Sequence, residues 1–181
     1  NWGKVLEFGT LTSGGYNELE VAINSDDFIG EPIFIAATYD GTTKKIYKNG
    51  IEIGSNSQSG YFQNLEATHR IGCNSVNADC FNGLIDNVII WDNALSQEDI
   101  LEAYNNGVDE NFIGTNTPGI GATLESIVAH YKFNSGSGDT LYDHSDNGND
   151  GTINGAQWVC NDMDLCGVCG GDNSSCSTVT D

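Results

Sequence analysis

Basic side chains are scarce in this sequence: 6 Lys and Arg stand against 26 Asp and Glu in 181 residues, a formal net charge of -20. Such a charge repels phosphate backbones and anionic lipid surfaces, which argues against a nucleic-acid or membrane-surface partner. Long apolar runs are also missing, because no stretch approaches the ~18 residues of a membrane span. The chain opens at Asn1 without a Met or an apolar leader, so we expect a mature or excised fragment linked to further modules.

What the sequence does contain is typical of an all-β fold. Hydrophobic residues make up 38% of the chain, enough for one sizeable core, and its length allows one domain plus an appendage. The acids are spread through turns rich in Asn, Asp, Gly and Ser. This pattern predicts many short strands joined by solvated loops.

The clearest local prediction is a β-hairpin around Asn49 and Gly50. This dipeptide tolerates the two positive φ angles of a type I′ turn, and residues 44–48 and 51–53 flank it. The preceding segment, 32–39, is apolar on both faces and predicts a strand in the middle of a sandwich.

Other strands follow from alternation or apolar runs. Residues 4–8 and 17–23 alternate with the period of half-buried strands, and residues 81–91 have two apolar faces, which predicts a long buried strand. Further strands are expected at 69–72, 127–133 and 152–159. A short helix should begin at Ser96, with Asp99 completing the cap, and end before Gly107.

Two segments carry a resemblance to a known family. Residues 34–41 (FIAATYDG) followed by 45–50 (KIYKNG) resemble the hairpin of laminin-G-like, concanavalin A-like jelly rolls. Residues 81–92 (FNGLIDNVIIWD) and 94–100 (ALSQEDI) resemble the last core strand and closing helix of laminin-G-like and pentraxin-like modules. The resemblance implies an all-β, antiparallel two-sheet jelly-roll sandwich with one short helix.

A third segment, 128–152, resembles the opening of such a module but lies after its end. Two arrangements are open: the fragment holds the tail of one module and the head of another, or the C-terminal head completes a circularly permuted single sandwich. We therefore expect a laminin-G-like jelly roll over 1–159 and a cysteine-rich tail over 160–181. Within the jelly roll, 1–107 is the main part, 108–126 a connection and 127–159 the head-like segment.

Six cysteines in a chain of extracellular composition predict disulfides. Cys73 and Cys80 can cross-link one loop, whereas the pairing in the tail, whose segment 166–176 resembles an ADAMTS-type cysteine motif, is open. A zinc site is the alternative there, because two of the tail cysteines have ligand spacing. The tail cysteines are Cys160, Cys166, Cys169 and Cys176.

The acidic loop at 143–151 is the strongest metal candidate. Closely spaced carboxylates and amides around glycines can wrap calcium, which takes six to eight oxygen ligands. The alternative is a pair of Asx turns in which these side chains bind their own backbone. The calcium of pentraxin-like relatives would lie at 74–79, where Asp79 is the only acid. The candidate ligands are Asp143, Asp146, Asn147, Asn149, Asp150 and, more remotely, Asp86.

Catalysis is not expected. Related glucanases use closely spaced acids on one strand, but here only Glu18 and Glu20 form such a pair, and a solvated strand face explains them. The leading hypothesis is a calcium-assisted, non-catalytic carbohydrate-binding module of an extracellular or cell-surface protein. The alternative is an adhesion or spacer module that binds protein or nothing. Candidate sugar-stacking aromatics are Tyr16, Tyr61 and Trp2.

Overall fold

The computed structural model describes residues 5–24, 32–63, 68–74, 79–108 and 126–159. Its strands form small antiparallel sheets, and one helix lies among them in the described part of the chain. This confirms the predicted all-β, antiparallel fold with a short helix. The elements are β1 (Val5–Thr12), β2 (Gly15–Ala22), β3 (Ile35–Tyr39), β4 (Thr43–Lys48), β5 (Ile51–Ser57), β6 (Val88–Trp91), α1 (Gln97–Asn106), β7 (Ile127–Tyr131), β8 (Thr140–Leu141) and β9 (Gly151–Thr152).

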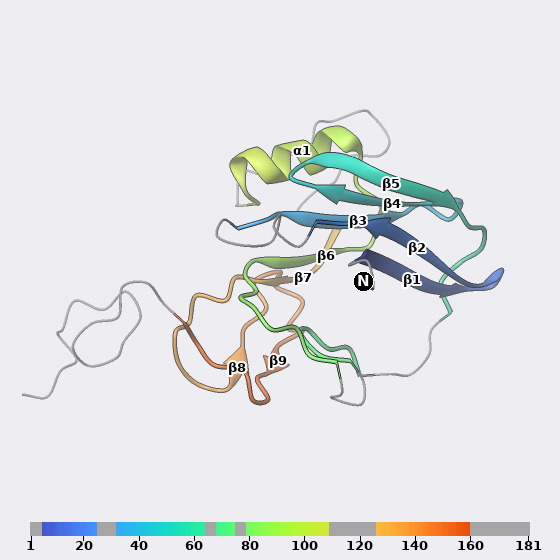
Figure 1. Cartoon of the computed structure of the whole chain (residues 1–181). Coiled ribbons are helices and arrows are strands. Elements are labelled where there is room, and N and C mark those ends of the chain that lie inside the picture. The colour runs from blue at the N-terminus through green and yellow to red at the C-terminus, as the bar shows by residue number, and fades with distance from the viewer. Residues whose placement is uncertain (1–4, 25–31, 64–67, 75–78, 109–125, 160–181) are drawn as a thin grey trace, which may run out of the picture. The chain divides into compact units, whose positions relative to one another are not determined.

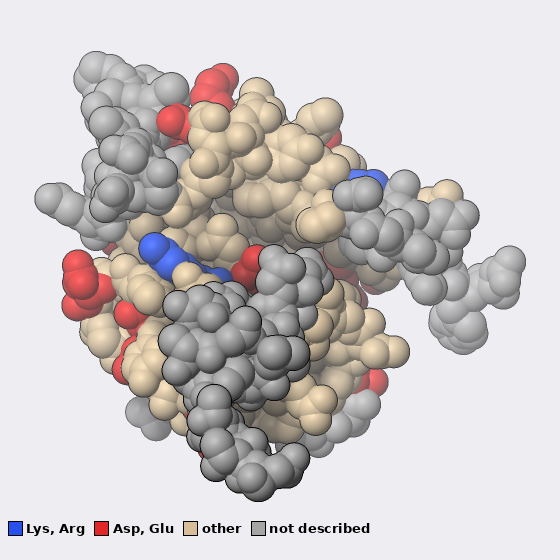
Figure 2. All heavy atoms as spheres, turned by 90° about the vertical axis from the view of Figure 1, so that its left-hand side faces the viewer, with Lys and Arg blue, Asp and Glu red and all other residues tan. Residues whose placement is uncertain are grey.

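The chain divides into two compact units. The first unit comprises Asn1–His69 and Trp91–Ser126, and the second comprises Arg70–Ile90 and Ile127–Asp181. The head-like segment at 127–159 therefore folds together with residues 70–90. Figure 2 shows acidic side chains at several separate points of the visible surface and few basic ones, as the composition implies.

In the first unit, β1 and β2 form a two-stranded ribbon, and β3, β4 and β5 form a three-stranded sheet (Figure 1). The ribbon pairs from Val5 opposite Ala22 to Thr12 opposite Gly15, around a tight turn. The predicted hairpin is confirmed, because Asn49 and Gly50 have φ angles of 50° and 78° between β4 and β5. The expectation that 32–39 is buried on both faces is wrong: β3 pairs only with β4 among the described strands, and Ile35 is exposed.

The predicted helix cap is also confirmed. The Ser96 hydroxyl accepts a hydrogen bond from the Asp99 amide, and the Asp99 carboxylate accepts one from the Ser96 amide. Gly107, with a φ of 74°, follows the helix. The Gln97 side chain donates to the Gly50 carbonyl, which attaches α1 to the β4–β5 turn. No helix among the described residues is long and apolar enough to cross a membrane.

The interior of the first unit is partly apolar and partly polar. Leu19 and Val21 of β2 pack over Gly54 of β5, where a Cβ would lie 2.4 Å from Val21 Cγ2. Beside them the fully buried Lys44 of β4 donates from its Nζ to the carbonyls of Phe8, at 3.1 Å, and Asn17, at 2.6 Å. A buried polar group must find such partners, because it would otherwise lose its hydrogen bonds to water.

Gln58 extends this polar layer toward the end of the ribbon. Its Nε2 donates to the Thr10 and Gly15 carbonyls, at 3.3 and 3.0 Å, and its Oε1 accepts from the Thr10 hydroxyl. Gln58 thereby binds both β1 and the start of β2. Side-chain hydrogen bonds therefore connect the ribbon to the segment that follows β5.

In the second unit, β6 pairs with β7 and β8 pairs with β9. The predicted long strand over 81–91 is wrong, because only Val88–Trp91 is a strand and Phe81 and Leu84 are exposed. Asn87 has a φ of 51°, a left-handed conformation that a continuous strand cannot contain. The strands predicted at 127–133 and 152–159 end early, at Tyr131 and Thr152, and 69–72 is not a strand.

The predicted cross-link between Cys73 and Cys80 is present as a disulfide. The two residues also form a β-bridge, so the covalent bond closes a loop whose ends are already paired. The tail over 160–181, including its four cysteines, lies outside the described residues, as do Trp2 and most of the predicted connection at 108–126.

Candidate functional site

The outward face of the β1–β2 ribbon carries an aromatic ring and three carboxylates. In β1 the inward residues Thr10 and Thr12 are buried. Because side chains alternate along a strand, Glu7, Gly9 and Leu11 face outward. Residues paired across the two strands share a face, and the pairs on the outward side are Glu7 with Glu20, Gly9 with Glu18, and Leu11 with Tyr16. The hairpin register therefore brings Glu7 beside the pair that the sequence pattern identified.

Tyr16 lies across the ribbon above Gly9. A Cβ at Gly9 would be 2.6 Å from the Tyr16 hydroxyl oxygen and 3.3 Å from Tyr16 Cζ, so only glycine leaves room for the ring there. The hydroxyl donates to the Glu18 carboxylate. This hydrogen bond, followed by desolvation and the negative charge of Glu18, raises the pKa of Tyr16 to about 12. The ring is anchored at its polar end, yet the side chain remains 62% exposed.

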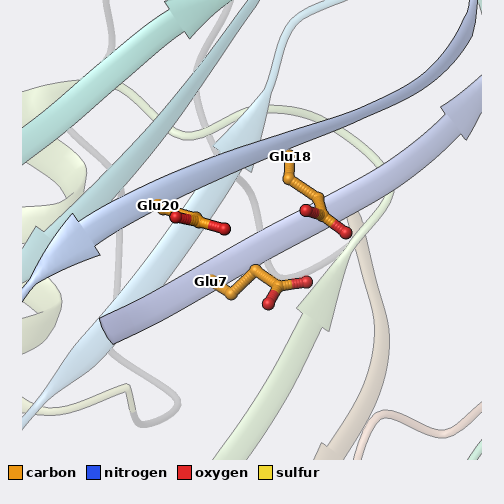
Figure 3. Close-up of side chains that lie close together, drawn as sticks. All are labelled: Glu7, Glu18 and Glu20. Atoms are coloured by element: carbon orange, nitrogen blue, oxygen red, sulfur yellow. The ribbon is translucent and has the colours of Figure 1, made fainter. Parts of the chain in front are cut away.

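Glu7, Glu18 and Glu20 form an exposed carboxylate cluster (Figure 3). One carboxylate oxygen from each lies within 4.8 Å of the others. The negative charge of Glu18 is the largest cause that raises the pKa of Glu7, with smaller contributions from desolvation, a hydrogen bond to Glu18 and the charge of Glu20. The carboxylate oxygens of these side chains can accept hydrogen bonds from hydroxyl or ammonium groups or can coordinate a metal ion.

Tyr61 lies at the turn of the same ribbon. The Ser13 amide donates to the Tyr61 carbonyl at 2.9 Å, and Phe62 forms a β-bridge with Thr12. Because Thr12 faces inward, the alternation of side chains puts Tyr61 on the outward side, as it does Tyr16. Tyr61 is 74% exposed. Two of the three predicted stacking aromatics thus belong to one end of the ribbon.

The acidic loop of the second unit is organised by Asp143. Its carboxylate accepts hydrogen bonds of 2.8 to 2.9 Å from the amides of His130, Ser145 and Asn149 and from the Ser145 hydroxyl. Desolvation opposes ionisation, but these hydrogen bonds outweigh it and lower the pKa of Asp143 to about 2. Asp143 therefore acts as an acceptor that holds the loop on β7.

The other candidate ligands of this loop have varied surroundings. The side-chain amides of Asn147 and Asn149 donate to carbonyls of β7, and Asp150 accepts from the Asp143 amide at 2.8 Å. Asp146 is exposed, as is Asp86, which precedes β6. Of the bonds in this loop, the one from the Ser145 amide to Asp143 has the spacing of an Asx turn, whereas Asn147 and Asn149 bind backbone of β7 and Asp150 binds across the loop. Calcium binding is the competing interpretation of this loop.

A calcium titration separates the two interpretations. Because the Asp143 oxygens already accept four donors, we expect no saturable rise in Tm between EDTA and ~5 mM CaCl₂, a concentration that would fill an extracellular-type site. Differential scanning calorimetry measures the shift. A rise that disappears in Asp146→Asn would instead support the calcium site.

Comparison with known proteins supplies the family. The sequence pattern of the concanavalin A-like lectin/glucanases superfamily matches residues 4–101, more than half of the chain. No curated protein matches the chain at a significant level. Among solved structures, an S-layer domain-containing protein from Clostridium thermocellum (residues 221–444) is 22% identical, with a TM-score of 0.33; the match covers 55% of this chain and 51% of that one, about half its length. By the family match, the chain belongs to the concanavalin A-like lectin/glucanase superfamily.

Proposed function

We propose that the chain is a non-catalytic carbohydrate-binding module that holds a glycan on the outward face of the β1–β2 ribbon. The supporting observation is the Tyr16 ring, which lies over Gly9 and is anchored through its hydroxyl to Glu18 while most of the side chain is open to solvent. An aromatic ring held in this way needs little ordering to stack on the apolar face of a sugar.

The polar groups next to the ring complete the proposed site. Glu7, Glu18 and Glu20 accept hydrogen bonds from sugar hydroxyls, which supply orientation while the ring supplies contact area. Tyr61 extends the aromatic surface past the turn. Extracellular location is part of the proposal, because the Cys73–Cys80 disulfide persists in oxidising compartments.

The absence of catalysis is also proposed. Glu18 and Glu7 are close enough to suggest a glucanase pair, but both are exposed on an open strand face. Glycoside hydrolysis requires a distorted sugar held between two carboxyls with different environments. We expect no release of reducing ends from any polysaccharide that binds.

Mutation of Tyr16 tests the proposal. A panel of polysaccharides, screened by affinity gel electrophoresis and followed by isothermal titration calorimetry, identifies the bound glycan. Tyr16→Ala should then weaken binding by about tenfold, the equivalent of one aromatic contact. Tyr16→Phe keeps the ring and should retain most of the affinity, whereas Gly9→Val should weaken binding because the new side chain displaces the ring.

Tyr142→Ala is the matched control, since Tyr142 is 53% exposed and belongs to the second unit. It should leave glycan affinity unchanged. If no glycan binds, or if Tyr16→Ala binds as well as the wild type, the adhesion or spacer hypothesis replaces this one.

A further inference from the structure

The charge of the ribbon face restricts the kind of glycan that it fits. Along the described outward side, β1 and β2 contribute three carboxylates and no Lys or Arg. The charge of Lys44 attracts Glu18, but neither Lys44 nor Lys45 offers its amine on this face. Lys44 is buried on the inward side with its Nζ on two carbonyls, and Lys45 forms an ion pair with Glu52 at 2.9 Å.

This negative charge favours some classes of sugar over others, and three classes can be compared: anionic, neutral and amine-bearing. An anionic sugar, such as a uronic acid or sulfated sugar, would meet like charges beside the ring and be repelled. A neutral sugar offers hydroxyl donors but leaves the repulsion among Glu7, Glu18 and Glu20 uncompensated. A protonated amine offsets that repulsion and forms charge-assisted hydrogen bonds with the carboxylates.

The aromatic ring favours the same class. The face of a tyrosine ring attracts ammonium groups through its quadrupole as well as stacking on the sugar ring itself. Tyr16 lies next to the carboxylates, because its hydroxyl is hydrogen-bonded to Glu18. One amino-sugar residue on Tyr16 therefore has carboxylates within reach of its amine.

We propose that the outward face of the β1–β2 ribbon selects amino-sugar polymers that carry free amines, with Tyr16 stacking on a sugar ring and the Glu7, Glu18 and Glu20 cluster pairing with ammonium groups. This inference rests on the glycan-binding function proposed above. It makes the three glutamates specificity-determining residues, and it assigns the ligand class from the charge and the ring together.

Two oligosaccharide series of equal length test the inference: β-1,4-linked glucosamine oligomers and their fully N-acetylated counterparts, titrated into the whole chain by calorimetry at about pH 6, where the amines are largely protonated. We expect the free-amine series to bind at least about tenfold more tightly. Raising the salt from ~50 to ~500 mM should reduce this preference, because exposed ion pairs are screened.

Substitutions then assign the preference to the ribbon face. Glu7→Gln and Glu20→Gln should each reduce affinity for the free-amine series by about threefold or more and reduce affinity for the acetylated series less, because glutamine still accepts a hydrogen bond from a sugar hydroxyl. Tyr16→Ala should weaken binding of both series. Glu98→Gln is the matched control, because Glu98 is an exposed acid on α1 and belongs to neither strand of the ribbon.

The possible outcomes are distinguishable. Equal, Tyr16-dependent binding of both series overturns the selectivity inference while glycan binding stands. Binding of the amine series that is unchanged in Tyr16→Ala, or reduced as much by Glu98→Gln as by Glu20→Gln, shows general attraction to the acidic chain and also overturns it. Absence of binding to these oligomers, with Tyr16-dependent binding of another glycan, overturns the inference alone; absence of binding to every glycan overturns both proposals.

Discussion

Replacing Lys44 with alanine should lower the free energy of unfolding by about 3 kcal/mol, since it removes buried methylenes and leaves two carbonyls without their donor. Lys44 is 0% exposed, and its Nζ donates to Phe8 and Asn17. Urea denaturation followed by far-UV circular dichroism measures the change. Lys44→Met keeps most of the side-chain volume and isolates the loss of the two hydrogen bonds, so it should be destabilised less.

Lys45 supplies the control from the adjacent position of β4. Its ion pair with Glu52 is partly exposed, at 36% and 34% of the two side chains, and such pairs contribute roughly 0 to 1 kcal/mol. Lys45→Ala should therefore unfold near the wild-type urea midpoint. Equal midpoints for Lys44→Ala and Lys45→Ala would contradict the role assigned to the buried amine.

Replacing Asp143 with asparagine should destabilise the second unit by about 2 kcal/mol at neutral pH. The substitution preserves shape but removes a charged acceptor shared by three amides and a hydroxyl, and it turns an NH₂ group toward some of these donors. Thermal unfolding and amide hydrogen exchange at His130 report the loss. Asp146→Asn is the control, because Asp146 is exposed and asparagine tolerates its φ of 66°.

The same carboxylate predicts a pH dependence. The pKa of Asp143 is about 2 in the folded chain against 3.8 for the unperturbed group, so the unfolded state binds the proton more readily. The stability that Asp143 contributes is fully present above about pH 4 and is lost as the pH falls toward about 2. The difference in Tm between wild type and Asp143→Asn should shrink over that window. A difference that stays constant from neutral pH to pH ~2 would contradict this assignment.

The sequence predicted those parts of the fold that local chemistry determines. Asn49 and Gly50 accept positive φ angles, Ser96 and Asp99 cap each other, and Cys73 and Cys80 are close enough in sequence to pair. Each of these features depends on residues fewer than ten positions apart. The long strand at 81–91 was mispredicted because its apolar pattern gives no sign of the left-handed backbone at Asn87.

For a related reason, the sequence alone identifies only part of the candidate site. Tyr16 and the Glu18 and Glu20 pair stand out in the sequence, but Glu7 joins them only through the register of β1 against β2. Gly9 looks like an ordinary small residue until the pairing places it under Tyr16. Likewise, the polar interior could not be foreseen, because the alternation that marks Lys44 as inward does not say which carbonyls will accept from it.

The buried amine of Lys44 also bears on how the chain avoids a wrong strand alignment. Its Nζ is bonded to one carbonyl on each strand of the hairpin, so it restrains how far β1 and β2 can shift along β4. A slip of one residue would reverse the two sides of a strand, burying Glu18 and Glu20 and exposing Leu19. An apolar interior would oppose such a slip only through the cost of burying the wrong side chains. The Lys44 amine adds to this cost, because a slip would also separate it from its two carbonyl acceptors. Lys44, although its side chain lies on the inward side, thus helps to fix the strand register that arranges the side chains of the outward face.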